Sequence, residues 1–409
     1  MRPGRGVLAL VCGGLVLGLV GAAVAFAFPE ASPLVPEHEG GDSTWAWLYL
    51  AAAVAAFAAY LAGLLVLSRP EAPRRLRAVV VVACAVQLLP LAGPVLLSTD
   101  LYTYWDYARI AVVHDGNPYE DVPSDFPEDP AFPLMGSYWH DTTSVYGPGF
   151  TLASEAHAAA VGESEEAAAL VYKALAALAM VALVLLAARL SPRPALAAAF
   201  VGWNPLLALH FAGGGHNDAW MMALVLAALA LAASGRRALA GVAWALAIAV
   251  KWVPLLFLPL RLLEARRIGR RIDHRGLGIA AAVIVAIATW RYGLSWLGAI
   301  GPLAGNLAED RASYAIPVQL ADGLGLPEGA VAAVFAAGFV LAYVWLLREA
   351  WRGRARLALT AGLLLVATSW LVPWYAVWAV PLAAVEEDRP ARLLALAMSA
   401  YLLRDAVPL

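Results

Sequence analysis

Long uncharged runs of apolar residues constrain the fold of this chain more than any other feature. Residues 7–28 and 45–67 contain no charged side chain, and each run reaches the roughly 20 residues that a helix needs to cross a hydrocarbon core. Hydrophobic side chains make up 62% of the 409 residues, and the mean hydropathy is +0.72. The sequence therefore predicts an all-α polytopic membrane protein, folded as one transmembrane domain over residues 1–409.

Charge and cysteine content argue against several other classes of protein. The formal net charge is −2, which disfavours nucleic acid as a partner because binding to it depends on clustered basic residues. Cys12 and Cys84 both fall inside predicted spans, so a disulfide framework is not expected. Residues 6–28 follow basic residues as a secretory signal does, but their apolar run exceeds the roughly 7–15 residues of such a signal. We therefore expect a first membrane helix there.

Arginine clusters predict the orientation, because basic residues favour the cytoplasmic side of a membrane. The clusters are Arg2 with Arg5, residues 69–77, Arg189 with Arg193, Arg236 with Arg237, residues 261–275 and residues 348–356. The predicted spans are residues 7–28, 45–67, 79–97, 167–188, 195–211, 219–233, 276–290, 331–347 and 357–371. We expect a multi-pass protein of the cell membrane with a cytoplasmic N-terminus and a large extracytoplasmic loop at residues 98–166.

Two prolines interrupt the spans in the second half of the chain. Residues 238–260 provide only one helix length between two cytoplasmic clusters, and Pro254 would break a helix in that segment. We expect a helical hairpin that rises partway into the membrane, turns near Lys251 and returns. The same pattern recurs around Pro373. Broken helices of this kind are tolerated where they line a protein cavity rather than lipid.

The outer loop is polar and aromatic in a chain that is otherwise apolar. Most helix connections are only a few residues long, so we expect this loop to form the front wall of an active site. An amphipathic helix is predicted after Asp100, with one apolar face made of Leu101, Tyr104, Trp105, Ala108, Ala111 and Val112. We expect it to lie flat on the outer surface, with Asp106 and Arg109 as an exposed ion pair of little energetic weight.

The sequence lacks the motifs of soluble nucleotide-dependent enzymes. It has no P-loop, no GxGxxG after a strand, no HExxH and no nucleophile elbow. A transferase whose site faces outward needs a donor that is already in the bilayer, and a polyprenyl-phosphate sugar meets that need. The aspartates are dispersed, so neither a metal nor another cofactor is expected.

Several short motifs together resemble one known family. They are Asp100-Leu101-Tyr102-x-Tyr104, Asn117-Pro118-Tyr119, Tyr146-Gly147-Pro148, Trp203-Asn204-Pro205, Gly213-Gly214-Gly215-His216-Asn217-Asp218, Lys251-x-x-Pro254 and Pro373-Trp374-Tyr375. In order and spacing, they resemble the polyprenol-phosphomannose-dependent α-1,6-mannosyltransferases of the GT-C superfamily of membrane glycosyltransferases. One position departs from the pattern, because Gly149 stands where a larger apolar residue is expected. The resemblance implies a GT-C-type bundle of about 11–13 helices.

The resemblance also implies a mechanism. Such enzymes move a hexose from a polyprenyl-phosphate donor in a single inverting displacement, with one acidic residue of the first outer loop as general base. Asp100 is the candidate for that catalytic role. The alternative is that Asp100 only caps the helix that follows it, a role that aspartate fills well.

The leaving group in this reaction is a lipid phosphate, which needs positive charge and hydrogen-bond donors more than a general acid. The predicted phosphate ligands are His216, Asn217, Lys251 and Arg311. A lysine in an apolar span usually indicates function, although Lys251 could instead snorkel to the surface and His216 could belong to a helix cap. The candidate substrate-binding residues are Tyr102, Arg109, Asn117, Tyr119, Tyr146, Asp218, Trp374 and Tyr375.

The expected partners are a polyprenyl-phosphate mannose donor, a lipid-linked mannan or other glycan acceptor, and the lipid bilayer. Two other classes of protein stay open at this point. A lipid-linked sugar flippase or transporter would also use broken helices, but its charged residues should lie near the membrane midplane. A glycan polymerase or ligase would share the lipid-phosphate site and differ in its acceptor.

Overall fold

Helices form all the regular structure in the computed structural model, which describes residues 4–36, 41–69, 75–269, 273–300, 314–404 and 407–408. These residues contain 17 α-helices and no strand. The prediction of an all-α polytopic chain is confirmed. The helices outnumber the predicted count of about 11–13, because the outer loop contains helices of its own and some predicted spans are broken.

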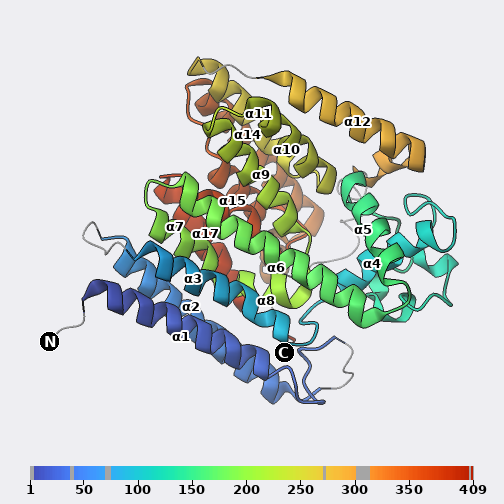
Figure 1. The fold of residues 1–409 in the computed structure, drawn as a ribbon, viewed down its shortest axis with the longest axis horizontal. Helices are drawn as coiled ribbons and strands as arrows, with labels where there is room; N and C mark the ends of the chain where they lie inside the picture. Colours follow the sequence, from blue (N-terminus) through green and yellow to red (C-terminus); the bar gives the residue numbers. More distant parts are fainter. Residues whose placement is uncertain are drawn as a thin grey trace.

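The helices follow the chain in a simple order. They are α1 (Arg5–Ala25), α2 (Ser43–Leu67), α3 (Leu76–Leu88), α4 (Asp100–Val112), α5 (Pro148–Val161), α6 (Glu165–Leu190), α7 (Pro194–Gly202), α8 (Pro205–Gly214), α9 (Asp218–Ala233), α10 (Arg237–Val250), α11 (Pro254–Arg267), α12 (His274–Tyr292), α13 (Ile316–Leu324), α14 (Glu328–Trp351), α15 (Leu357–Ala367), α16 (Val380–Val385) and α17 (Arg389–Arg404). Helices α1 to α3 pack together at one edge, α6 crosses the middle, and α4 and α5 project at the opposite side (Figure 1).

Five of the described helices are long and apolar enough to cross a membrane, namely α1 from Gly6, α2, α6, α12 and α14. The pair α7 and α8 could make a sixth span, bent by 55° at its break. This break divides the predicted span at residues 195–211. Pro205 begins α8, and the Asn204 side chain accepts a hydrogen bond from the Leu206 backbone N–H at 3.1 Å. A new helix therefore starts where the sequence predicted a continuous one.

Both predicted breaks in the second half of the chain are confirmed. Helix α10 ends at Val250, and α11 begins at Pro254. After α15, the 3₁₀-helix η7 (Pro373–Trp378) begins at the second proline. Glu386, directly after α16, accepts the Leu357 backbone N–H at 2.9 Å. The chain thus returns to the start of α15, as the hairpin interpretation predicts.

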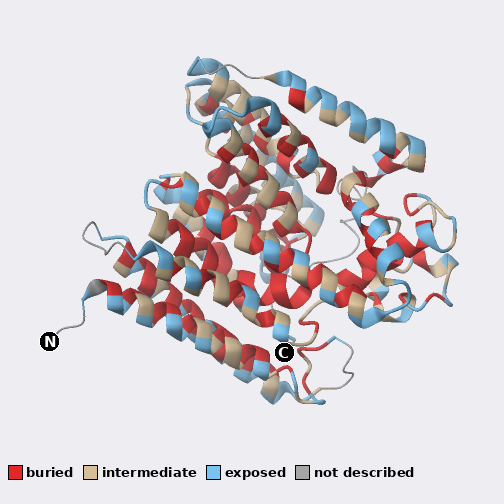
Figure 2. Cartoon of the chain, viewed as in Figure 1, coloured by how far each residue is buried: buried red, intermediate tan, exposed pale blue. Residues whose placement is uncertain are grey.

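The helix after Asp100 is buried on both faces, so the prediction of a surface helix is wrong. Every residue from 101 to 111 in α4 is buried (Figure 2). The predicted surface ion pair is also wrong, because Arg109 is 3% exposed and its Nε donates to Asp129 Oδ1 at 2.7 Å. Helix α5, which the sequence did not predict, and the short helical turn η3 (Phe132–Leu134) both pack on α4.

Asp106 is left as a buried acid without an ion-pair partner among the described residues. Its exposed fraction is 2%, and its Oδ2 has no hydrogen bond. Burial raises the pKa of Asp106 to about 7, and the nearby Asp129 carboxylate acts in the same direction. The Arg109 guanidinium only partly opposes this rise.

Small residues allow close packing between the first two helices and the bend at α7. The Trp203 side chain is fully buried. A methyl group at Gly63 would lie 2.7 Å from Trp203 Cζ3, and one at Gly13 would lie 2.8 Å from Trp203 Cζ2. Small residues of this kind let membrane helices approach each other closely. The indole ring therefore occupies space that the two glycines leave.

We expect Gly63→Ala to lower the free energy of unfolding by about 1–3 kcal/mol, because the added methyl overpacks the Trp203 ring. The control is Gly14→Ala on the neighbouring helix, where a methyl would meet nothing within 4 Å. Thermal unfolding of the detergent-solubilised variants measures both effects. Equal melting temperatures for the two variants would contradict this packing.

The raised pKa of Asp106 predicts a specific pH dependence. Between about pH 4 and pH 7 the folded protein keeps a proton that the unfolded chain releases. The stabilising contribution of Asp106 is therefore complete below about pH 4 and is lost as pH rises through about 7. As pH rises from 5 to 8, we expect the melting temperature of Asp106→Asn to increase relative to that of the wild type. A difference that stays constant over this range would argue against a buried acid.

Candidate active site

Asp100 occupies the first position of α4, with a side chain that is 16% exposed. Its Oδ2 lies 3.3 Å from His216 Nδ1 and accepts a hydrogen bond from the Tyr104 hydroxyl at 3.5 Å. The backbone N–H of Tyr102 donates to the Thr99 carbonyl at 2.9 Å. The Asp100 carboxylate therefore does not cap the helix and remains accessible to a ligand.

The turn between α8 and α9 places polar side chains in a fully buried position. Gly215 ends α8 with a φ of +73°, a left-handed conformation that favours glycine. His216 and Asn217 are both 0% exposed. His216 stacks on Trp374 with 3.7 Å between the ring centroids. This turn therefore holds one imidazole ring rigidly beside Asp100.

Several buried polar atoms in this turn and in α8 have no partner within the described part of the chain. Nε2 of His216 and both polar side-chain atoms of Asn217 make no hydrogen bond, and neither does either ring nitrogen of the buried His210. Buried polar groups are hydrogen-bonded in the great majority of cases. The unsatisfied atoms therefore indicate a place where a ligand or water binds.

Asp218 and Lys251 join three distant segments of the chain. Asp218 begins α9 and is fully buried, and its Oδ1 accepts hydrogen bonds from Lys251 Nζ at 2.8 Å and from Trp378 Nε1 at 2.6 Å. Lys251 Nζ also lies 4.8 Å from the Tyr375 ring centroid. The lysine is only 12% exposed. It therefore lies inside a carboxylate and aromatic site and does not snorkel to the surface.

Tyr146 connects the outer loop to this cluster. It packs edge to face on Tyr104 with 5.0 Å between ring centroids. The next residue, Gly147, donates its backbone N–H to the Val250 carbonyl at the end of α10, at 3.2 Å. Burial raises the pKa of Tyr146 well above its usual range, and the Asp100 carboxylate adds to this rise. The hydroxyl therefore stays protonated as a hydrogen-bond donor.

The close approach of α5 to α10 explains Gly149, the position that departs from the family pattern. A methyl group at Gly149 would lie 2.8 Å from Ala249 Cβ, and one at Gly147 would overlap the Ala249 carbonyl. A larger side chain at Gly149 would push the outer loop away from the end of α10. In this protein the position requires glycine.

Most of the predicted site residues lie together in this cluster, namely Asp100, Tyr146, His216, Asn217, Asp218, Lys251, Trp374 and Tyr375. Others contact the framework of the outer loop. Asn117 Nδ2 donates to the Tyr292 carbonyl at 3.1 Å, the Tyr119 hydroxyl donates to the Tyr146 carbonyl at 3.0 Å, and Arg109 is paired as described above. Tyr102 is buried on α4, and Arg311 lies outside the described residues.

Sequence reasoning missed two residues that support the site. Trp378 binds Asp218, and it stands three residues after the predicted Tyr375 in an aromatic segment. Lys173 on α6 is buried and donates to the carbonyls of Gly93 and Pro94 at 2.6 and 2.8 Å, just before Asp100. The criterion that selected Lys251, a lysine inside an apolar run, would have found Lys173 as well.

The fold and the site together define a polytopic α-helical membrane protein with a buried polar site between broken helices. In the part of the chain that the structure describes, no group of three or more His, Cys, Asp or Glu side chains could hold a metal ion. The family model described as alpha-(1->6)-mannopyranosyltransferase, N-terminal domain, matches residues 5–266. The chain therefore belongs to the alpha-(1->6)-mannopyranosyltransferase family.

Two curated relatives agree with this family. The chain is 28% identical over 346 residues to alpha-(1->6)-mannopyranosyltransferase A of Mycobacterium tuberculosis, which is 71% of this chain and 63% of that protein. It is also 28% identical over 246 residues to alpha-(1->6)-mannopyranosyltransferase A of Corynebacterium glutamicum, covering 53% of this chain and 49% of that protein. The chain thus spans less than two thirds of the length of these relatives. No solved structure matches.

The ion pair between Asp218 and Lys251 predicts a coupled effect of substitution. We expect Lys251→Met to lower the free energy of unfolding by about 3–5 kcal/mol, because it leaves a buried carboxylate without its cation. Asp218→Asn in the same chain should recover much of that loss, since the neutral amide needs no counter-charge. Thermal unfolding of the wild type, both single variants and the double variant measures the coupling. Additive effects of the two substitutions would contradict a direct pair.

Proposed function

We propose that this protein moves a mannose from a polyprenyl-phosphate donor to a lipid-linked mannan or other glycan acceptor. Membership of the alpha-(1->6)-mannopyranosyltransferase family supports the sugar and the linkage. The observation that supports the site best is Asp100, a partly exposed carboxylate that lies beside His216, whose ring nitrogens are buried and make no hydrogen bond. A general base must have free lone pairs within reach of the attacking hydroxyl.

The proposed reaction is a single displacement at the anomeric carbon of the donor. The acceptor hydroxyl oxygen attacks this carbon, Asp100 takes the hydroxyl proton, and the bond to the phosphate oxygen breaks with its electron pair. The configuration at the anomeric carbon inverts. His216 and Tyr104 both contact Asp100 Oδ2, which leaves Oδ1 to accept the proton.

The leaving phosphate requires hydrogen-bond donors and positive charge in a place that water does not fill. We assign this role to His216, Asn217 and Lys251. Lysine has three N–H donors, and Asp218 accepts from Lys251, so N–H donors remain for a phosphate oxygen. Arg311 stays a prediction for the same role. No metal or other cofactor is part of the proposal.

The proposed orientation places the site on the extracytoplasmic side of the cell membrane. The start of α10 and the end of α11 are rich in arginine, whereas Asp218 and Lys251 lie at the opposite ends of α9 and α10. Basic residues favour the cytoplasmic side. The N-terminus is then cytoplasmic, and the outer loop with Asp100 faces a donor that arrives in the bilayer.

The decisive experiment incubates the purified protein with radiolabelled polyprenyl-phosphate mannose and a lipid-mannan acceptor. An α-linked mannosylated product, identified by linkage analysis, supports the proposal. Movement of the labelled donor across a proteoliposome membrane, with no product formed, would instead indicate a flippase or transporter. Product formed only by transfer of larger glycans would indicate a polymerase or ligase.

We expect Asp100→Asn to lower the rate of transfer by about 10²–10⁴-fold, because the amide keeps the shape of the side chain but cannot accept a proton at neutral pH. Donor binding should change little, since the phosphate ligands are intact. The matched control is Asp115→Asn. Asp115 is exposed on the same loop and has a φ of +53°, a conformation that asparagine tolerates well. Near-normal turnover by the Asp100 variant would exclude this residue as the base.

A further inference from the structure

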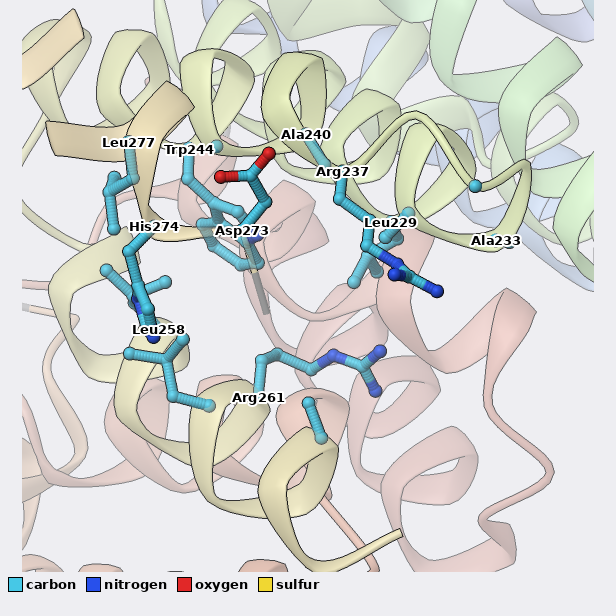
Figure 3. Close-up of a pocket in the computed structure, with 15 residues that line it drawn as sticks. Leu229, Ala233, Arg237, Ala240, Trp244, Leu258, Arg261, Asp273, His274 and Leu277 are labelled. Atoms are coloured by element: carbon cyan, nitrogen blue, oxygen red, sulfur yellow. The ribbon is translucent and has the colours of Figure 1, made fainter. Parts of the chain in front are cut away.

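A cavity lies at the other end of the helices that form the site. It has a volume of about 330 Å³, within the usual range of ligand pockets. The end of α9, the start of α10, the second half of α11 and the start of α12 line it (Figure 3). Asp218 begins α9, and the cavity starts at Leu229, about three helical turns further along the same helix. The cavity is therefore separate from the proposed catalytic site.

The backbones of α10 and α12 form a closely packed wall of this cavity. A methyl group at Gly276 would overlap the Ala238 carbonyl, and one at Gly241 would overlap the Leu277 backbone nitrogen. Glycine at both positions lets the two helices touch. The cavity is therefore bounded by a rigid helix crossing rather than by mobile side chains alone.

The rim of the cavity is cationic. Figure 3 shows the Arg237 and Arg261 guanidinium groups extending into the space between the helices. The Arg237 side chain is exposed and makes no ion pair or hydrogen bond with any described residue, whereas its backbone N–H donates to the Gly235 carbonyl at 3.0 Å. Arg261 pairs with Glu264 on its own helix. Among the described residues that line the cavity, Asp273 has the one carboxylate, which accepts the Arg275 backbone N–H at the start of α12 and so serves as a helix cap.

The walls of the cavity are apolar. Leu229, Leu258 and Leu277 approach it from three different helices, and the Trp244 indole closes one side. The adjoining helix α12 exposes large apolar side chains, including Ile279 and Val283, with exposed fractions of 67% and 51%. In a membrane protein, a helix surface of this kind faces lipid. A lipid molecule therefore has access to the helix that lines the cavity.

We propose that this cavity binds an anionic phospholipid. Its phosphate contacts Arg237 and Arg261 at the rim, and part of an acyl chain lies along the leucines and Trp244. Basic pockets between membrane helices bind anionic head groups through such contacts. A free phosphate would satisfy the arginines but would leave the apolar walls uncovered, so the two-sided lining favours the lipid. This proposal does not depend on the reaction proposed for Asp100.

Native mass spectrometry of the detergent-purified full chain tests the proposal. The probes are phosphatidylglycerol, phosphatidylcholine and glycerol 3-phosphate. We expect phosphatidylglycerol to bind at least about tenfold more tightly than phosphatidylcholine. Arg237→Gln should weaken phosphatidylglycerol about fivefold, because one basic contact is lost. Ala233→Trp should also weaken it, because the indole fills the cavity from its exposed edge while every cation remains.

The control variant is Arg77→Gln, which removes an exposed arginine from α3, a helix that does not line the cavity. We expect it to leave phosphatidylglycerol binding unchanged. Equal binding of the two lipids, or equal losses in Arg77→Gln and Arg237→Gln, would overturn the proposal. Binding would then not depend on this cavity. Binding of glycerol 3-phosphate as tight as that of phosphatidylglycerol would also overturn it, because the occupant would then be a soluble phosphate compound.

Discussion

The arrangement of the candidate site depends on the ion pair between Asp218 and Lys251. A fully buried carboxylate is stable only where a cation and hydrogen-bond donors compensate for its lost hydration. Lys251 and Trp378 provide this compensation at 2.8 and 2.6 Å. Lys251 reaches Asp218 from the break between α10 and α11, and Trp378 reaches it from η7. The helix breaks therefore bring distant segments of the chain to the start of α9.

The same break also positions the proposed base. The Val250 carbonyl, one residue before Lys251, holds the Gly147 backbone, and the adjacent Tyr146 ring packs on Tyr104. The Tyr104 hydroxyl in turn donates to the Asp100 carboxylate. Asp100 is thus connected through the outer loop to the α10–α11 junction. A substitution that shifts this junction displaces the carboxylate as well, although the two lie on different helices.

The sequence predicted the features that local chemistry determines. Proline lacks a backbone N–H donor and disfavours the interior of a helix, so the breaks at Pro254 and Pro373 were predictable, although α11 continues through Pro259. The burial of α4 was not predictable, because periodicity shows which side chains share a face and not what covers that face. Arg109 finds its partner at Asp129, twenty residues along the chain, and Asp106 at i−3 remains unpaired. Which of these two carboxylates pairs with Arg109 depends on how the loop folds.

The proposed reaction moves negative charge across the site without changing its total. As the proposed base, Asp100 loses its charge when it takes the hydroxyl proton, and the phosphate of the proposed polyprenyl-phosphate donor gains one when the glycosidic bond breaks. The charge therefore moves from the start of α4 towards the groups proposed to bind the phosphate, which are His216, Asn217 and Lys251. Charge that develops in a desolvated site is stabilised by donors and opposite charges that are already in place. The Asp218 carboxylate holds Lys251 in position for this role before any donor binds.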